Sequence, residues 1–152
     1  MTQIKIEPFN IVGISVRTDN NNGKGSEDIS KLWQQFISES VLDKIPNKVD
    51  NTIYCIYTEY DGDYTHPYTA ILGCKVNKLD SIPHGLVAKQ FGYGSFNKYV
   101  ATGNIFAGSV FNKWQEIWNL DISRAYTYDF EVYGDKAINP ENAEVEIFIA
   151  VK

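Results

Sequence analysis

The chain repeats one pattern of predicted elements twice, and this internal repeat restricts the folds open to it. The first copy predicts a strand, a helix and two strands, at Ile4–Arg17, Ser26–Glu39, Thr52–Tyr60 and Tyr68–Val76. The second copy predicts the same order at Leu86–Val100, Ile105–Trp118, Ala125–Tyr133 and Glu144–Val151. We therefore expect an α+β fold of duplicated βαββ units, with one curved antiparallel sheet, two helices packed on one side and a ligand cleft between the halves.

Local sequence similarity supports the repeat. Leu32-Trp33-Gln34-Gln35-Phe36 returns as Lys113-Trp114-Gln115-Glu116-Ile117, and the segment Tyr57–Asp63 resembles Tyr128–Asp135. At 152 residues the chain has the length of a single domain. We assign the pseudo-repeats to residues 1–80 and 81–152, with the boundary in a turn at Leu79–Gly85.

Each predicted helix carries one narrow apolar stripe, which is typical of a helix lying on a sheet. The stripes are formed by Ile29, Leu32, Trp33, Phe36 and Ile37, and by Val110, Phe111, Trp114, Ile117 and Trp118. Ser26 and Asn104 are suitable capping residues at the two helix starts. Gly92 and Gly94 interrupt the first strand of the second copy and indicate a bend or bulge.

The strand at Ala125–Tyr133 has two distinct faces, because successive side chains point to opposite sides of a strand. One face carries Tyr126, Tyr128, Phe130 and Val132, and we interpret it as the core that meets the helices. The other face carries Thr127, Asp129, Glu131 and Tyr133. We expect this second face to lie where the two halves meet.

Charge and hydropathy exclude several classes of protein. The net charge of −5 and the absence of a basic patch argue against direct binding of nucleic acid or of an anionic membrane. No run approaches the roughly 20 apolar residues of a membrane span, and the N-terminus lacks a signal-peptide pattern. We therefore expect a cytoplasmic protein.

The sequence shows no pattern for a metal or cofactor. His66 and His84 lie in turns beside proline without partners at metal-ligand spacing, and no phosphate-binding or dinucleotide-binding glycine motif is present. Cys55 and Cys74 fall in neighbouring predicted strands. A disulfide is one reading, but two buried, reduced thiols fit a cytoplasmic protein better.

Over nearly its whole length the chain resembles the GyrI-like small-molecule-binding domain, the effector-binding domain of many AraC-type and MerR-type regulators. The resemblance rests on Leu32–Phe36, on Phe111–Trp118, on Tyr128-Asp129-Phe130-Glu131-Val132-Tyr133 and on the closing segment Pro140–Ile147. It implies a ligand cleft between two βαββ units, with Glu131 as the acidic pocket residue that engages lipophilic cations. The first strand begins near Ile4, so we expect no DNA-binding domain.

Glu131 is the main candidate for a functional side chain, since a buried carboxylate is costly unless it has a partner. The candidate ligand-binding rings are Tyr133, Tyr57, Tyr54, Trp33, Phe106, Trp114 and Tyr93. Simple core packing is the competing interpretation for each ring and is favoured for Trp33 and Trp114. We expect Asp129 at a solvated strand end, and Glu59 at the surface.

Three functions remain open from the sequence. The first is a stand-alone binding protein for hydrophobic or cationic small molecules, with Glu131 selecting the charge. The second is a hydrolase, because the resemblance extends to proteins that hydrolyse reactive cyclopropane-bearing toxins with a pocket acid; Glu131 would then be the catalytic residue. The third is a protein-interaction module, for example one that restrains a topoisomerase. Consumption of an excess of substrate would distinguish the hydrolase from the binding protein. A protein partner that stays bound after Glu131 is replaced would support the interaction module.

Overall fold

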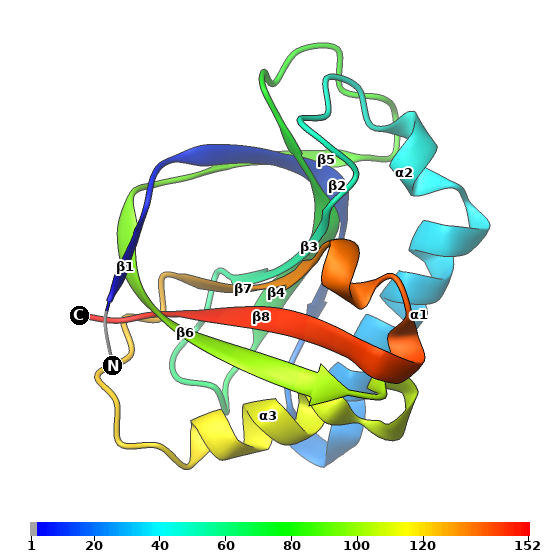
Figure 1. The fold of residues 1–152 in the computed structure, drawn as a ribbon. Helices are drawn as coiled ribbons and strands as arrows, with labels where there is room; N and C mark the ends of the chain where they lie inside the picture. The colour runs from blue at the N-terminus through cyan, green and yellow to red at the C-terminus, as the bar shows by residue number, and fades with distance from the viewer. Residues whose placement is uncertain (1–2) are drawn as a thin grey trace.

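The computed structural model describes residues 3–152 and contains one eight-stranded antiparallel sheet (Figure 1). The strands are β1 (Ile4–Ile6), β2 (Phe9–Thr18), β3 (Ile53–Thr58), β4 (Tyr68–Val76), β5 (Val87–Phe91), β6 (Gly94–Gly103), β7 (Tyr128–Tyr133) and β8 (Ala143–Ala150). The α-helices are α1 (Lys24–Ser38), α2 (Val41–Lys44) and α3 (Ser109–Trp118). Short 3-10 turns are η1 (Asn21–Gly23), η2 (Ile105–Ala107), η3 (Asp135–Ala137) and η4 (Pro140–Asn142).

The strand order displays the duplication directly. The sheet runs β1-β6-β8-β7-β3-β4-β2-β5, so that β2-β4-β3 and β6-β8-β7 are equivalent triplets that meet at β3 and β7. In this central pairing Cys55 lies opposite Glu131, and Ile56 opposite Phe130. The predicted α+β fold of two βαββ units sharing one curved sheet is confirmed.

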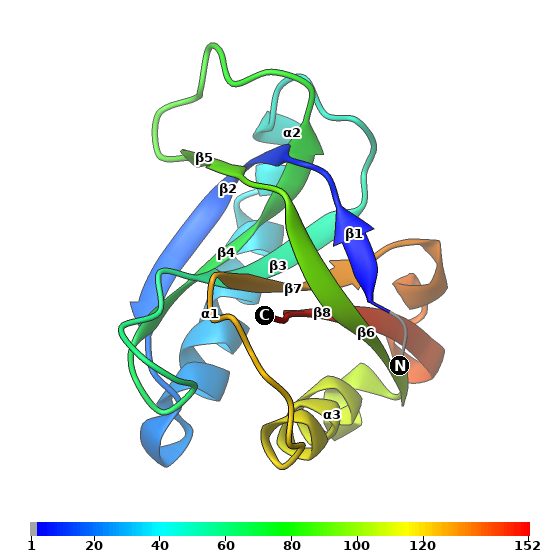
Figure 2. The ribbon, with the colours of Figure 1, turned by 90° about the vertical axis from the view of Figure 1, so that its left-hand side faces the viewer.

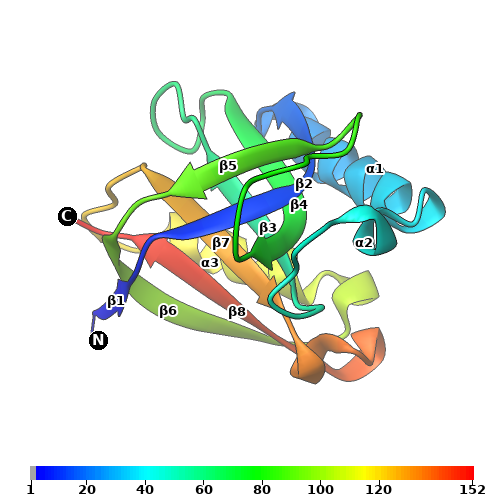
Figure 3. The ribbon, with the colours of Figure 1, turned by 90° about the horizontal axis from the view of Figure 1, so that it is seen from above.

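The first strand of each repeat is broken into two pieces, which the sequence prediction joined into one. The break falls at Glu7-Pro8 between β1 and β2, and at Gly92-Tyr93 between β5 and β6. Proline offers no amide hydrogen for strand pairing, and glycine weakens a strand. The short piece before each break pairs with the other repeat, because β1 pairs with β6 and β5 pairs with β2. These exchanged pairings curl the sheet, so that β5 and β2 lie across the face opposite α3 (Figure 3).

The inside of the curl holds an aromatic core. Phe91, Phe96, Tyr128, Phe130 and Phe148 are all buried in it. The prediction that the Tyr128–Phe130–Val132 face meets the helices is therefore wrong. Alternation along a strand shows which residues share a face, but the curl of the sheet decides what covers that face.

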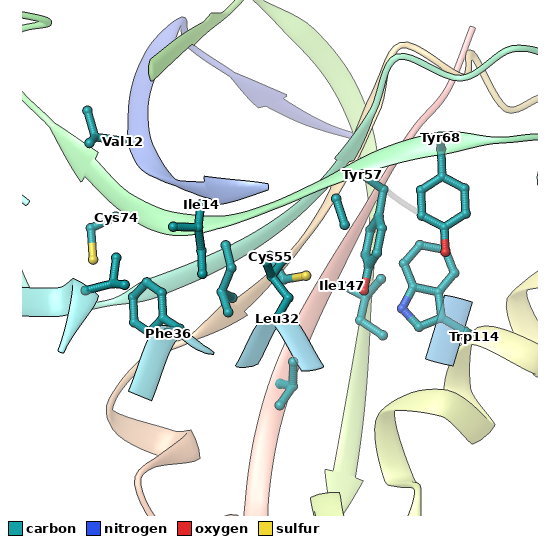
Figure 4. Packing of buried hydrophobic residues seen from close by; sticks show 14 of the residues in the cluster. Val12, Ile14, Leu32, Phe36, Cys55, Tyr57, Tyr68, Cys74, Trp114 and Ile147 are labelled. Atoms are coloured by element: carbon teal, nitrogen blue, oxygen red, sulfur yellow. The ribbon is translucent and has the colours of Figure 1, made fainter. Parts of the chain in front are cut away.

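The second core lies between the other face of the sheet and the helices α1 and α3, which both lie on that side (Figures 1 and 2). Figure 4 shows Leu32 and Phe36 of α1 packed toward the sheet, with Tyr57, Tyr68 and Trp114 grouped at one end of the cluster. The two cysteine thiols are buried here and free, as predicted.

The helix starts differ from their predicted positions. α1 begins at Lys24 after Gly23, whose φ of 74° is in the left-handed region, so Ser26 is not the N-cap. α3 begins at Ser109, because Asn104 caps the separate turn η2 by accepting a hydrogen bond from the Phe106 amide at 2.9 Å. The short helix α2 was not predicted.

A substitution at Gly13 tests the packing of β2 against β4. Gly13 lies opposite Gly73, and a Cβ at Gly13 would stand 2.1 Å from the Leu72 carbonyl oxygen. We expect Gly13→Ala to lower the free energy of unfolding by about 1–3 kcal/mol in urea denaturation, because backbone atoms must move apart. Gly92→Ala is the control, since nothing lies within 4 Å of its Cβ position. Equal stability of the two variants would contradict the expectation.

Candidate functional site

A cleft of about 1160 Å³ opens on the helix side of the sheet, above β3 and β7 and between α1 and α3. Its lining is mainly apolar and includes the rings of Trp33, Tyr57, Phe106, Phe111, Trp114 and Tyr133. This volume is slightly larger than the roughly 300–1000 Å³ that is usual for small-molecule sites. The cleft therefore has room for a bulky ligand.

Glu131 lies at the base of this cleft with only 2 % of its surface exposed. Tyr57 and Trp114 donate hydrogen bonds to its Oε2 at 2.8 and 2.6 Å, and Tyr133 donates to its Oε1 at 2.6 Å. The three donors come from β3, α3 and β7, so both repeats are needed to assemble them. Period-two alternation puts Tyr133 on the same strand face as Glu131.

All three partners of Glu131 are neutral, and no cationic side chain within residues 3–152 forms an ion pair with it. Burial raises the pKa of the Glu131 carboxyl above 4.5, and the three hydrogen bonds oppose that rise by stabilising the anion. A carboxylate held this way attracts a positive charge that enters the cleft. The raised pKa of this carboxyl also suits it to proton transfer.

The raised pKa of Glu131 predicts a dependence of stability on pH. The folded state holds this proton more tightly than the unfolded state, whose pKa is near 4.5, so stability from this group is lost as pH rises through the folded pKa. We expect the stability of Glu131→Gln relative to the unmodified protein to increase as the pH rises above about 4.5 in urea denaturation. A difference that does not change with pH would contradict this.

The structure brings most of the predicted rings to the cleft. Trp33 lines it and packs edge-on against Tyr133 at a centroid distance of 4.8 Å. Phe106 lines it with 79 % of its surface exposed. Trp114 is buried in the core as well as bonded to Glu131, so core packing and site formation coincide in one side chain.

Two predicted rings lie elsewhere. Tyr54 points to the inner face of the sheet, where it packs with Phe130 and lies near the Lys75 ammonium group. It is three residues before Tyr57, and an odd spacing along a strand places two side chains on opposite faces. Tyr93 lies in the break between β5 and β6, is 57 % exposed and does not line the cleft.

Asp129 is fully buried, so its predicted position at a solvated strand end is wrong. It forms an ion pair with Arg124 at 2.8 Å and accepts hydrogen bonds from the Tyr60 hydroxyl and from the Ala150 amide at 2.7 Å. Burial raises the pKa of Asp129, while the Arg124 guanidinium opposes that rise. The pair could not be predicted because the loop before β7 folds back beside the C-terminal strand. Glu59, as predicted, is exposed, and it pairs with Lys89.

The rim of the cleft includes exposed apolar side chains that the sequence analysis did not assign to it. Ile37 of α1 is 71 % exposed, and Ile138, which follows η3, is 78 % exposed. An isoleucine within the polar segment Gly134–Asn139 was the available signal for Ile138. Single exposed apolar residues are common and indicate no function by themselves. These residues become informative because they lie around the opening of one cleft.

A duplicated βαββ sheet with an aromatic cleft on its helix side defines an effector-binding domain of the GyrI-like type, and the comparison with known proteins agrees. The model of the integron-associated effector-binding protein family, Cass2, matches residues 4–151. The chain belongs to this family, and the resemblance found from its sequence is confirmed.

Similar proteins include regulators and stand-alone domains. The chain is 26 % identical to the "Putative transcriptional regulator protein YobU" of Bacillus subtilis (strain 168), covering 100 % of this chain and 96 % of the relative. It is 28 % identical to the integron cassette protein VCH_CASS2 from the mobile metagenome of Vibrio cholerae, with a TM-score of 0.76 and coverage of 99 % and 95 %. The structure of SAV2435 bound to tetraphenylphosphonium shares the fold at 16 % identity, with a TM-score of 0.80 and coverage of 99 % and 93 %.

The described residues provide two further observations. No helix among them is long and apolar enough to cross a membrane. Nor do three or more histidine, cysteine, aspartate or glutamate side chains within residues 3–152 gather as metal ligands would.

Proposed function

We propose that this protein is a cytoplasmic binding protein for lipophilic organic cations, with an aromatic cleft that supplies affinity and Glu131 that selects positive charge. The observation that carries this proposal is the buried Glu131 carboxylate, which has three neutral hydrogen-bond donors and faces a large cleft. A buried anion without a counter-ion is destabilising, and a cationic ligand offsets that cost.

The expected energies are large enough for discrimination. At a separation of about 6 Å and an effective dielectric constant of about 20, two unit charges attract by about 3 kcal/mol. Contacts between a cation and an aromatic face add about 0.5–2 kcal/mol each. The apolar rim residues Ile37, Phe106 and Ile138 suit the hydrophobic part of such a ligand.

Tetraphenylphosphonium is a suitable test ligand, because SAV2435 binds it in a fold similar to that of this chain. Tetraphenylborate is the matched anion, since it has nearly the same shape and hydrophobicity with the opposite charge. We expect isothermal titration calorimetry to detect the cation with a dissociation constant in about the micromolar range and the anion at least about 100-fold more weakly. Equal affinity for the two ions would overturn charge selection, and no binding of either would overturn the proposal.

Hydrolysis is the second candidate function, favoured by the raised pKa of Glu131 and the tyrosine hydroxyls of Tyr57 and Tyr133 that contact it. A group with such a pKa can act as a general acid or base. The test is incubation of a small amount of protein with an excess of a strained, electrophilic cyclopropane substrate. Consumption of many equivalents, lost in Glu131→Gln, would establish an enzyme, whereas protection of one equivalent indicates a binder.

A further inference from the structure

The hydrogen bonds of Glu131 distinguish its two carboxyl oxygens. Oε2 accepts from the Tyr57 hydroxyl at 2.8 Å and from the Trp114 indole nitrogen at 2.6 Å. Oε1 accepts from the Tyr133 hydroxyl at 2.6 Å. An indole N–H donates and cannot accept, whereas a tyrosine hydroxyl does both. The two donors therefore hold Oε2 as an acceptor, and a proton on this carboxyl belongs on Oε1.

Tyr133 is the partner that can adjust to both states of the carboxyl. When Glu131 is ionised, the Tyr133 hydroxyl donates to Oε1, as it does in the structure. When Oε1 carries a proton, the same hydroxyl accepts from it. The Tyr133 ring lines the cleft and is packed edge-on against Trp33 at 4.8 Å. The exchange of roles requires only a rotation of the hydroxyl hydrogen, so the ring stays in place.

The surroundings of Glu131 leave its negative charge uncompensated. Within residues 3–152 the titratable and charged groups around it are Cys55 and Tyr57 of β3, Tyr68 of β4, Asp129 and Tyr133 of β7, Arg124 before β7, and Asp50 and Asp135 in the lining of the cleft. Asp129 and Arg124 balance each other as an ion pair. Burial raises the pKa of Cys55, Tyr57 and Tyr68, which keeps them neutral.

Protonation and cation binding are therefore alternative ways to neutralise Glu131. Burial raises the pKa of its carboxyl and so favours the protonated form. A positive charge in the cleft favours the ionised form, because an opposite charge nearby stabilises the carboxylate. Asp50 and Asp135 are exposed to solvent, which screens their effect on this balance.

We propose that a cation entering the cleft replaces a proton on Oε1 of Glu131, and that Tyr133 passes this proton to the cleft. The inference rests on the proposed function. The O–H bond at Oε1 breaks as its proton moves to the Tyr133 oxygen, and the former hydroxyl proton of Tyr133 leaves to solvent. The products are the carboxylate, a Tyr133 hydroxyl that donates to Oε1, and one free proton. This final arrangement of Glu131 and Tyr133 is the one in the structure.

Calorimetry in two buffers of different ionisation enthalpy counts the protons released. The probe is tetraphenylphosphonium, whose charge does not depend on pH, titrated at a series of pH values from mildly alkaline to mildly acidic. We expect release to approach about one proton per bound cation at the acidic end, with an affinity that falls by up to about tenfold per pH unit. Glu131→Gln should release none at ligand concentrations high enough to bind it. Glu59→Gln, which changes an exposed carboxylate, should behave like the unmodified protein.

Tyr57→Phe and Tyr133→Phe are matched variants that locate the proton, since each removes one hydroxyl from one carboxyl oxygen. A hydrogen bond to a charged group is roughly twice as strong as one between neutral groups. Loss of Tyr57 therefore weakens mainly the anion, and we expect its affinity profile to move to higher pH by about half a unit or more. Loss of Tyr133 removes a partner of both forms and should move the profile less. Comparison along each variant's own profile cancels changes in affinity that do not depend on pH.

The outcomes separate the two proposals. If tetraphenylphosphonium binds with no proton release at any pH, proton exchange is overturned while cation binding stands. A profile that moves as far in Tyr133→Phe as in Tyr57→Phe would overturn the position on Oε1 and the role of Tyr133. If tetraphenylphosphonium does not bind, the proposed function fails and proton exchange fails with it. The position of the proton is then decided by infrared titration of the carboxyl band in the two free variants: a smaller shift in Tyr133→Phe supports Oε1, and an equal or larger shift overturns it.

Discussion

Glu131→Gln is expected to weaken the binding of tetraphenylphosphonium by about 100-fold, which corresponds to the loss of roughly 3 kcal/mol of charge attraction. Glutamine has nearly the same shape and keeps an oxygen that accepts from Tyr57 or Trp114, so the aromatic walls should remain in place. The measurement is calorimetric titration at a mildly alkaline pH of about 8, because the raised pKa of Glu131 shifts ionisation of its carboxyl to higher pH.

The same variant should lose discrimination between cation and anion. We expect tetraphenylborate to bind Glu131→Gln more tightly than it binds the unmodified protein, because repulsion from the buried carboxylate has gone. Glu59→Gln is the matched control, since Glu59 is an exposed strand-end carboxylate of the first repeat and pairs with Lys89. A change of less than about twofold in cation affinity for Glu131→Gln would show that Glu131 does not contribute to cation binding.

Asp129→Ala is expected to give the largest loss of stability. The substitution leaves the Arg124 guanidinium buried without its counter-ion and removes acceptors from the Tyr60 hydroxyl and the Ala150 amide. Breaking a buried ion pair from one side costs about 3–5 kcal/mol. Since domains of this size are stable by about 5–15 kcal/mol, a large part of the folding free energy should be lost in urea denaturation.

Two further variants separate the buried charge from general effects of substitution. Asp129→Asn keeps an oxygen for the Ala150 amide and should cost less than Asp129→Ala. Asp61→Ala removes the surface ion pair between Asp61 and Arg17 and should cost less than about 1 kcal/mol, because exposed pairs contribute little. Equal losses for Asp129→Ala and Asp61→Ala would show that the buried pair has no special role.

Parts of the fold and of the site could be predicted because they depend on neighbours along the chain. The apolar stripes of α1 and α3 place Leu32, Phe36, Trp114 and Ile117 toward the sheet, where they are buried. The resemblance in sequence pointed to Glu131. Two of its three donors are far less accessible to such reasoning, since Tyr57 and Trp114 are 74 and 17 residues away from it.

The sequence by itself determined the duplication, the strand alternation that places Glu131 and Tyr133 on one face, and the family. These features follow from local periodicity and from residue identity. Only the tertiary structure decided that helices cover the Glu131 face, that the exchanged strands β1 and β5 close an aromatic core on the other face, and that Asp129 meets Arg124. The physical reason is that the environment of a side chain is set by segments distant in sequence, whose approach depends on how the whole sheet curls.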